Sequence, residues 1–148
     1  MSTYCASSSG TEDFTRISLV QLTGDGNTQI NNNTVEVEDD DTSGKADQYQ
    51  DYTLSQQVTL TPGQTYTITI HNELVSNGHL PIGAKVYIDW NGDVDFDDTS
   101  EEIGTIDENT LEGSITFTVP VTGFSGQTRL RVVSQAGVSA FDIGPCDV

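Results

Sequence analysis

The residues best suited to chemistry are oxygen-bearing side chains that alternate along one short stretch. They are Asp89, Asn91, Asp93, Asp95 and Asp97, with Glu101 and Glu102 following. Calcium takes six to eight oxygen ligands, and a short loop supplies them at alternate positions before a closing carboxylate. Without a cation, these acidic groups would repel one another in a tight turn. The spacing therefore predicts a calcium site formed by these residues.

The first three alternating positions match the D-x-[DN]-x-[DN]-G pattern of calcium loops, and two later positions depart from it. Val94 stands where glycine usually makes the sharp turn, and Ser100 stands where the closing glutamate would be. The closing ligand is therefore expected at Glu101 or Glu102. The alternative is a solvated acidic hairpin without a metal. The strict alternation and the apolar run at residues 86–88 favour the metal site.

A second acidic run, Asp39–Asp41, lies close to Glu36 and Glu38. It lacks both the alternation and a turn-forming glycine. A block of like charges is typical of a solvated loop. We therefore expect no second cation there.

The charge of the chain restricts its partners. Its 148 residues include 5 basic and 23 acidic ones, which gives a formal net charge of −18. Nucleic acids are bound through Lys and Arg, so they are excluded as main partners, and anionic membranes are disfavoured for the same reason. Membrane insertion is not expected, because the sequence lacks an apolar run of about 20 residues. The positive partner is expected to be a metal ion or a cationic ligand, although a surface adapted to high salt would explain the charge as well.

The two cysteines, Cys5 and Cys146, lie near opposite ends of the chain and form no C-x-x-C pair. We expect a disulfide between them in preference to two buried free thiols. On the chain-entropy model, a loop of this length stabilises the fold by about 4–5 kcal/mol. Such a bond indicates an oxidising compartment. No signal peptide is visible before Cys5, so we expect that a targeting segment has been removed.

Alternating apolar residues predict strands along most of the chain. In the clearest case Tyr66, Ile68 and Ile70 alternate with threonines. The other expected strands are Phe14–Leu22, Tyr52–Leu60, Val86–Trp90, Ile115–Val121 and Leu130–Val132. The polar stretch Asn31–Gly44 is expected to be a long loop or an exposed edge strand. About seven to nine short strands separated by turns predict an all-β, antiparallel two-sheet β-sandwich of the jelly-roll or immunoglobulin-like kind. We expect one domain over residues 1–148.

No catalytic constellation stands out in the sequence. His71 and His79 are expected to make surface hydrogen bonds, and no serine lies in a G-x-S-x-G turn. Metal binding accounts for the best-spaced carboxylates better than acid–base catalysis does. Trp90, the single tryptophan, is expected to pack against the base of the acidic loop. We therefore predict that the protein is not an enzyme.

A set of short motifs runs along nearly the whole chain in a recognisable order. They are Tyr4-Cys5-Ala6, Phe14-Thr15-Arg16-Ile17 with Val20-Gln21-Leu22, Ile30-Asn31-Asn32 with Ser43-Gly44, Tyr49-Gln50-Asp51-Tyr52-Thr53, Leu60-Thr61-Pro62-Gly63, Tyr87-Ile88-Asp89-Trp90-Asn91-Gly92-Asp93 with Asp95-Phe96, Gly126-Gln127-Thr128-Arg129-Leu130-Arg131-Val132, and Pro145-Cys146. With these motifs the chain resembles the GEVED domain family of bacterial cell-surface and secreted proteins. The resemblance implies a calcium-stabilised extracellular β-sandwich associated with adhesion or surface display. It implies no particular ligand or reaction.

The chain departs from the family after the second cysteine. The family has an acidic strand there, whereas this sequence stops at Val148. A sandwich without that strand exposes an unpaired edge that can accept another strand. The segment Val35-Glu36-Val37-Glu38 reads like the missing strand. We hypothesise that it pairs into the gap within its own chain or in an identical subunit, and the second case would build a filament. The alternative is that the sequence is cut short before the strand.

Two classes of function fit these observations. The first is a calcium-stabilised structural or adhesive module of a bacterial surface protein or fibre, whose partners are neighbouring domains or identical subunits. The second is a glycan-binding module of a secreted protein or hydrolase. Sugar binding through the metal requires an open coordination position, whereas a closed shell favours the structural role. Both place the protein outside the cell.

Overall fold

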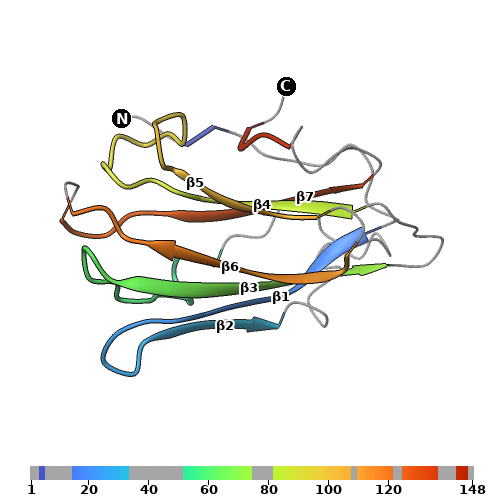
Figure 1. The fold of residues 1–148 in the computed structure, drawn as a ribbon, viewed down its shortest axis with the longest axis horizontal. Helices are drawn as coiled ribbons and strands as arrows, with labels where there is room; N and C mark the ends of the chain where they lie inside the picture. Colours follow the sequence, from blue (N-terminus) through green and yellow to red (C-terminus); the bar gives the residue numbers. More distant parts are fainter. Residues whose placement is uncertain are drawn as a thin grey trace.

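The computed structural model of the chain consists of two antiparallel sheets (Figure 1). The structure describes residues 4–5, 15–33, 52–74, 82–107, 110–121, 125–136 and 143–146. These residues form seven strands and the turns between them, without a helix. The expectation of an all-β, two-sheet sandwich is confirmed.

The first sheet has four strands in the order β2-β1-β3-β6. They are β1 (Thr15–Thr23), β2 (Gln29–Asn33), β3 (Thr65–Leu74) and β6 (Glu112–Thr118). The alternation predicted for β3 is present, because Ile68 and Ile70 are fully buried while Thr67 on the opposite face is exposed. On that outer face the Thr67 hydroxyl pairs with the Thr116 hydroxyl of β6 at 2.9 Å. Each strand thus gives one face to the core and a polar face to solvent.

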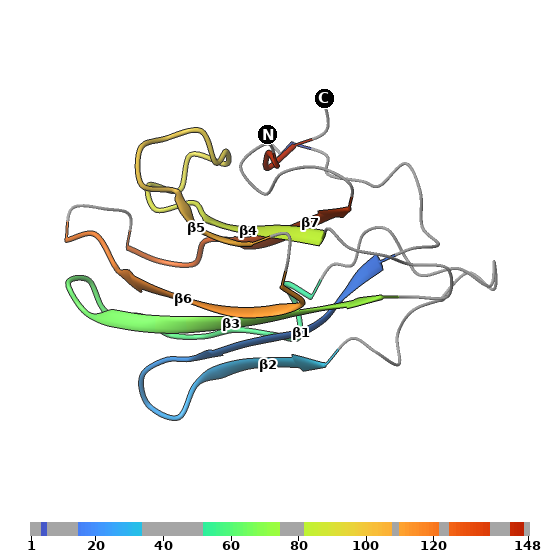
Figure 2. The ribbon, with the colours of Figure 1, turned by 45° about the vertical axis from the view of Figure 1, so that its right-hand side comes forward.

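The second sheet has three strands in the order β5-β4-β7, and its middle strand is buried on both faces. The strands are β4 (Ile82–Ile88), β5 (Glu102–Ile106) and β7 (Leu130–Ala136). The short segments 4–5 and 143–146 lie over the face that is turned away from the first sheet (Figures 1 and 2). On that face the Tyr87 hydroxyl donates a hydrogen bond of 3.0 Å to the carbonyl of Ile143. The acidic loop therefore starts from a strand that is covered on both sides.

One apolar core lies between the two sheets and takes residues from both. Its buried members are Val20, Leu22, Ile68, Ile70, Ala84, Val86, Ile88, Ile106, Ile115, Phe117 and Val119. Trp90 packs against this core with its ring centroid 6.2 Å from that of Phe117. Trp90 therefore lies at the base of the acidic loop, as the sequence indicates.

The segment 52–60 differs from the prediction, because it is not a continuous strand. The amides of Ser55 and Gln56 donate to the carbonyl of Tyr52 and close a turn, and Leu54 at its tip is 99% exposed. Gln57 forms an isolated bridge to Gln29 of β2, and the side chain of Gln56 accepts a hydrogen bond of 3.3 Å from the amide of Asn31. Further along, residues 58 and 60 are partly buried against the core. The apolar parity of this segment therefore reflects packing at the edge of the sheet, without a ladder of hydrogen bonds.

Two strands were not delimited from the sequence. β2 begins at Gln29 and runs into the stretch predicted to be a loop or an edge strand, and it is the edge strand over its described part. β5 follows the acidic loop directly, where a short sequence containing Gly104 gives little alternation. The expected assembly strand Val35–Glu38, the acidic run Asp39–Asp41 and His79 lie outside the described residues.

Candidate metal site

The acidic stretch forms the connection between the antiparallel strands β4 and β5. It rises from the ends of these strands on the side of the second sheet where segments 4–5 and 143–146 lie (Figure 2). Its two ends are fixed by backbone hydrogen bonds, from Ile88 to the carbonyl of Glu101 at 2.9 Å and from Asp89 to the carbonyl of Arg129 at 3.1 Å. The loop is therefore held by its own hairpin and by the approach to β7.

Within the loop, three alternate side chains accept hydrogen bonds from the backbone amide two residues ahead. The amides of Asp93, Asp95 and Asp97 donate to the side chains of Asn91, Asp93 and Asp95 at 3.1, 3.3 and 2.9 Å. Such Asx turns curl the chain around a common centre. This local chemistry explains why alternating acidic residues produce a compact loop.

Two carboxylates at the base of the loop are buried. Asp89 is 0% exposed and Glu101 is 1% exposed. Asp89 accepts hydrogen bonds from the amides of Gly92 at 2.7 Å and Val94 at 3.0 Å. Glu101 accepts from the amide of Trp90 at 3.0 Å. These bonds orient the two side chains without neutralising them.

The structure brings three of the predicted ligands into one group, Asp89, Asp93 and Glu101. One carboxylate oxygen from each lies within 4.8 Å of the others. A second group consists of Asp93, Asp95 and Asp98 and shares Asp93 with the first. Both groups offer only hard oxygen donors, which is the donor set that calcium prefers.

The electrostatics of the first group are unfavourable without a cation. Burial raises the pKa of the Glu101 carboxyl, and the nearby charges of Asp89 and Asp98 raise this pKa further. Backbone hydrogen bonds from Asp98 and Trp90 lower it in part. Within the described part of the chain, no salt bridge joins Asp89, Asp93 or Glu101 to a basic side chain. Asp89 and Glu101 thus place two acidic groups in a region with little access to water.

Other predicted ligands lie elsewhere. Glu102 points away from the loop and accepts a bond of 2.7 Å from the ammonium group of Lys85, which is itself buried. Asp97 is exposed and belongs to neither acidic group. Asn91 lies at the rim, where its amide nitrogen donates to Asp93 at 3.0 Å and also to Asp98. Of the two glutamates left open by the sequence, Glu101 is therefore the one that faces the loop.

Sequence reasoning missed two features of this site. Asp98 was passed over because it breaks the alternation, although it lies where the second acidic group forms. Tyr4 was not considered either, yet its hydroxyl donates a hydrogen bond of 2.7 Å to Oδ2 of Asp89. Only the position of Phe96 between two aspartates hinted that aromatic side chains pack on the loop. The ring of Phe96 lies 5.0 Å from that of Tyr4.

The two cysteines form a disulfide, Cys5–Cys146, with their Cα atoms 5.5 Å apart. The two short segments that carry these cysteines, 4–5 and 143–146, lie on the outer face of the second sheet, on the same side as the acidic loop (Figure 1). Arg131 is buried next to the disulfide and donates to the carbonyl of Pro145 at 2.8 Å. The sequence predicts the pairing of the cysteines, whereas their position on the same side as the acidic loop is a property of the fold.

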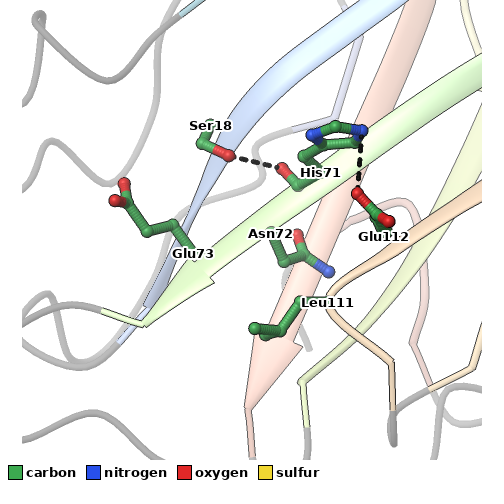
Figure 3. Close-up of a pocket in the computed structure, with 6 residues that line it drawn as sticks. All are labelled: Ser18, His71, Asn72, Glu73, Leu111 and Glu112. Carbon is green, nitrogen blue, oxygen red and sulfur yellow. Dashed lines mark hydrogen bonds and ion pairs between the residues drawn. The ribbon is translucent and has the colours of Figure 1, made fainter.

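A second candidate site is a cavity of about 440 Å³ on the first sheet, near the end of β3 and the start of β6 (Figure 3). It is lined by Ser18, His71, Asn72, Glu73, Leu111 and Glu112. Asn72 is only 4% exposed, and neither polar atom of its side chain has a hydrogen-bond partner in the described structure. His71 lies at this cavity with its Nε2 3.3 Å from a carboxylate oxygen of Glu112. A buried amide without partners is uncommon and indicates a place for a polar ligand or water.

The fold and the acidic loop define a β-sandwich with a candidate metal site on its β4–β5 connection. The family model of the GEVED domain matches residues 83–148, which contain this loop and strands β5, β6 and β7. The resemblance to the GEVED family is therefore confirmed over this part of the chain. No curated protein and no solved structure matches the chain.

GEVED domains are modules of extracellular proteins, and this match suggests the same setting for the present chain. The described residues contain no helix of the length and apolar character that crossing a membrane requires. The disulfide agrees with an extracellular setting, because disulfides persist in oxidising environments.

Proposed function

We propose that this protein is a calcium-stabilised structural module of an extracellular protein, without catalytic activity. The observation that carries the proposal is the pair of buried carboxylates, Asp89 and Glu101, which has no basic partner in the described structure. Two buried like charges destabilise a fold unless a cation lies between them. A calcium ion would supply that charge.

The residues that would hold the ion are those of the first acidic group, Asp89, Asp93 and Glu101. Asp95 and Asp98, which approach Asp93 in the second group, would provide further oxygen ligands. Calcium accepts such a large set of oxygens in an irregular arrangement, whereas magnesium demands near-ideal octahedral geometry. The long, hydrogen-bonded β4–β5 loop therefore suits calcium better.

The structural role follows from the position of this loop. It closes the hairpin that contains β4, the central and fully buried strand of the second sheet. An ion bound here would fix the hairpin and the aromatic side chains that pack on it. An adhesive role in a bacterial surface protein or fibre, with neighbouring domains or identical subunits as partners, is the setting in which we expect this rigidity to be used.

Thermal unfolding with calcium and with chelator tests the proposal. At a calcium concentration about 100 times the Kd, binding should add about 2.7 kcal/mol to the free energy of unfolding and raise Tm by about 5–10 °C. Glu101→Gln should abolish this increase. Glu102→Gln is the matched control, because this neighbouring glutamate bonds to Lys85 instead and should leave the calcium-dependent increase intact.

Identical unfolding curves with calcium and with chelator would contradict the proposal. Loss of the calcium effect in the Glu102→Gln variant, with retention in Glu101→Gln, would mean that Glu102 and not Glu101 is the closing ligand. The baseline stability of each variant is measured in chelator, so that a general loss of stability is separated from a loss of binding.

A second candidate function, glycan binding, is favoured by one observation. Asn72 carries an unpartnered amide in a polar cavity, and amides commonly recognise sugar hydroxyls by hydrogen bonds. This cavity lies away from the acidic loop, so such binding would not require calcium as a bridging ion. A glycan array probed with the wild type and with Asn72→Leu, each with and without chelator, tests it. Binding lost in Asn72→Leu and kept in chelator supports this candidate, and binding lost only in chelator places the sugar at the metal.

A further inference from the structure

The N-terminal residue pair Tyr4–Cys5 lies on the acidic loop although the two are far apart in sequence. The Tyr4 hydroxyl donates a hydrogen bond of 2.7 Å to Asp89, which is 85 positions away. The Tyr4 ring stacks on Phe96 with a centroid distance of 5.0 Å and an interplanar angle of 27°. One contact therefore orients a buried carboxylate, and the other holds the outer part of the loop.

Tyr4 is held in this position by the disulfide and by Arg131. Cys5 is bonded to Cys146, and the Arg131 guanidinium donates to the sulfur of Cys5 at 3.4 Å and to the carbonyl of Pro145 at 2.8 Å. The same guanidinium lies 5.0 Å from the centroid of the Phe96 ring. The disulfide, the arginine and the loop aromatic thus form one connected cluster.

The hydrogen bonds on Asp89 leave room for a cation. A carboxylate has about four acceptor positions on its two oxygens. The amides of Gly92 and Val94 and the hydroxyl of Tyr4 occupy three of them. Tyr4 therefore orients the remaining position without blocking it.

We propose that Tyr4 is a positioning residue for the metal site and that, through it, cation binding and the Cys5–Cys146 disulfide stabilise each other. This inference rests on the proposed function, because it assumes that the acidic loop binds a cation. With the disulfide formed, the Tyr4–Cys5 pair is already held against the loop, so cation binding costs less conformational entropy. After reduction, this pair is no longer tied to Cys146. Cation binding must then order the pair as well, which costs conformational entropy.

Reciprocity gives the proposal a second consequence. If the disulfide strengthens cation binding by some factor, the cation must favour the disulfide over the two thiols by the same factor. Reduction by dithiothreitol transfers two electrons and two protons to the Cys5–Cys146 bond. It yields two thiols and the cyclic disulfide of the reagent. Calcium should shift this equilibrium toward the protein disulfide, and a tenfold shift corresponds to about 30 mV.

Calcium titration calorimetry on the oxidised full chain is the first test. Replacing a residue that orients a metal ligand typically weakens metal binding by about 10- to 100-fold, and we expect this for Tyr4→Phe. Tyr66→Phe is the matched control, because it removes a hydroxyl that bonds to Asp25 at 3.0 Å, away from the loop. An unchanged or tighter Kd in Tyr4→Phe would overturn the positioning role.

The coupling itself is tested by the dithiothreitol equilibrium of the wild type and of Tyr4→Phe, each with calcium and with chelator. We expect calcium to protect the disulfide about tenfold or more in the wild type and clearly less in Tyr4→Phe. This measurement does not depend on whether a cysteine-free variant folds. Equal protection in the two proteins, or none in a wild type that binds calcium, would overturn the coupling. If the wild type binds no calcium in the calorimeter, the proposed function fails and this inference fails with it.

Discussion

The amide of Val94 donates a hydrogen bond of 3.0 Å to Oδ2 of Asp89, and Val94 makes this bond with a positive φ of 76°. A β-branched residue in the left-handed region is strained, because its side chain crowds the backbone. Such strain costs about 1–3 kcal/mol. The loop thus keeps the turn geometry of calcium loops at a position where the usual glycine is missing.

Replacing this valine tests whether the strain is real. Val94→Gly should raise the free energy of unfolding by about 1 kcal/mol, because relief of the strain exceeds the entropy cost of about 0.5–1 kcal/mol that glycine adds. Chemical denaturation in saturating calcium measures it. Val121→Gly, at a position that is 77% exposed and has no positive φ, should lower stability instead. A loss of stability in Val94→Gly equal to that in Val121→Gly would contradict the expectation.

The choice between two neighbouring aspartates gives a second prediction. Asp98 belongs to the second acidic group, whereas Asp97 is exposed and belongs to neither. Asp98→Asn should therefore weaken calcium binding by at least about tenfold. Asp97→Asn removes the same charge and should have a much smaller effect, since exposed charges interact weakly. Calorimetric titration of the two variants measures the difference in calcium affinity. Weaker binding in Asp97→Asn than in Asp98→Asn would favour Asp97, the ligand predicted from the alternation.

The buried amide of Asn72 leads to a third prediction. An unsatisfied buried polar group costs about 1–3 kcal/mol, so Asn72→Leu should raise the free energy of unfolding by a similar amount. Urea denaturation measures the difference. Asn31→Leu is the control, because Asn31 is exposed and its side chain accepts a hydrogen bond from Gln21. Lower stability in Asn72→Leu would mean that water or a ligand satisfies the amide.

Arg131 provides a fourth prediction. Its buried guanidinium bonds to the carbonyl of Pro145 and lies over the ring of Phe96. Arg131→Lys keeps the charge and loses the planar donor, so we expect the free energy of unfolding to fall by about 2 kcal/mol. Arg129 also lies over a ring, that of Tyr4, at 4.6 Å. Arg129→Lys should nevertheless have a smaller effect, because Arg129 is less buried. Denaturation at one fixed calcium concentration compares the two variants.

The sequence by itself determined those features that depend on local spacing. Alternating apolar residues placed β3 correctly, since neighbouring side chains of a strand point to opposite faces. Alternating polar residues located the loop, because the side chains of Asn91, Asp93 and Asp95 each accept a hydrogen bond from the backbone amide two residues ahead. The same parity was misleading at residues 52–60, where a turn at Tyr52 interrupts the pattern and leaves Leu54 exposed.

Only the tertiary structure decided which side chains meet. Glu101, and not Glu102, faces the loop. Adjacent residues of an extended chain point to opposite sides, and the register of β5 against β4, which shifts next to Tyr87, turns Glu102 toward Lys85. The hydrogen bond from Tyr4 to Asp89 joins positions 85 apart, so no local sequence pattern predicts it. Contacts of this kind arise when the sheets pack and the disulfide holds residues 4–5 and 143–146 over the second sheet. Packing, and not spacing, determines them.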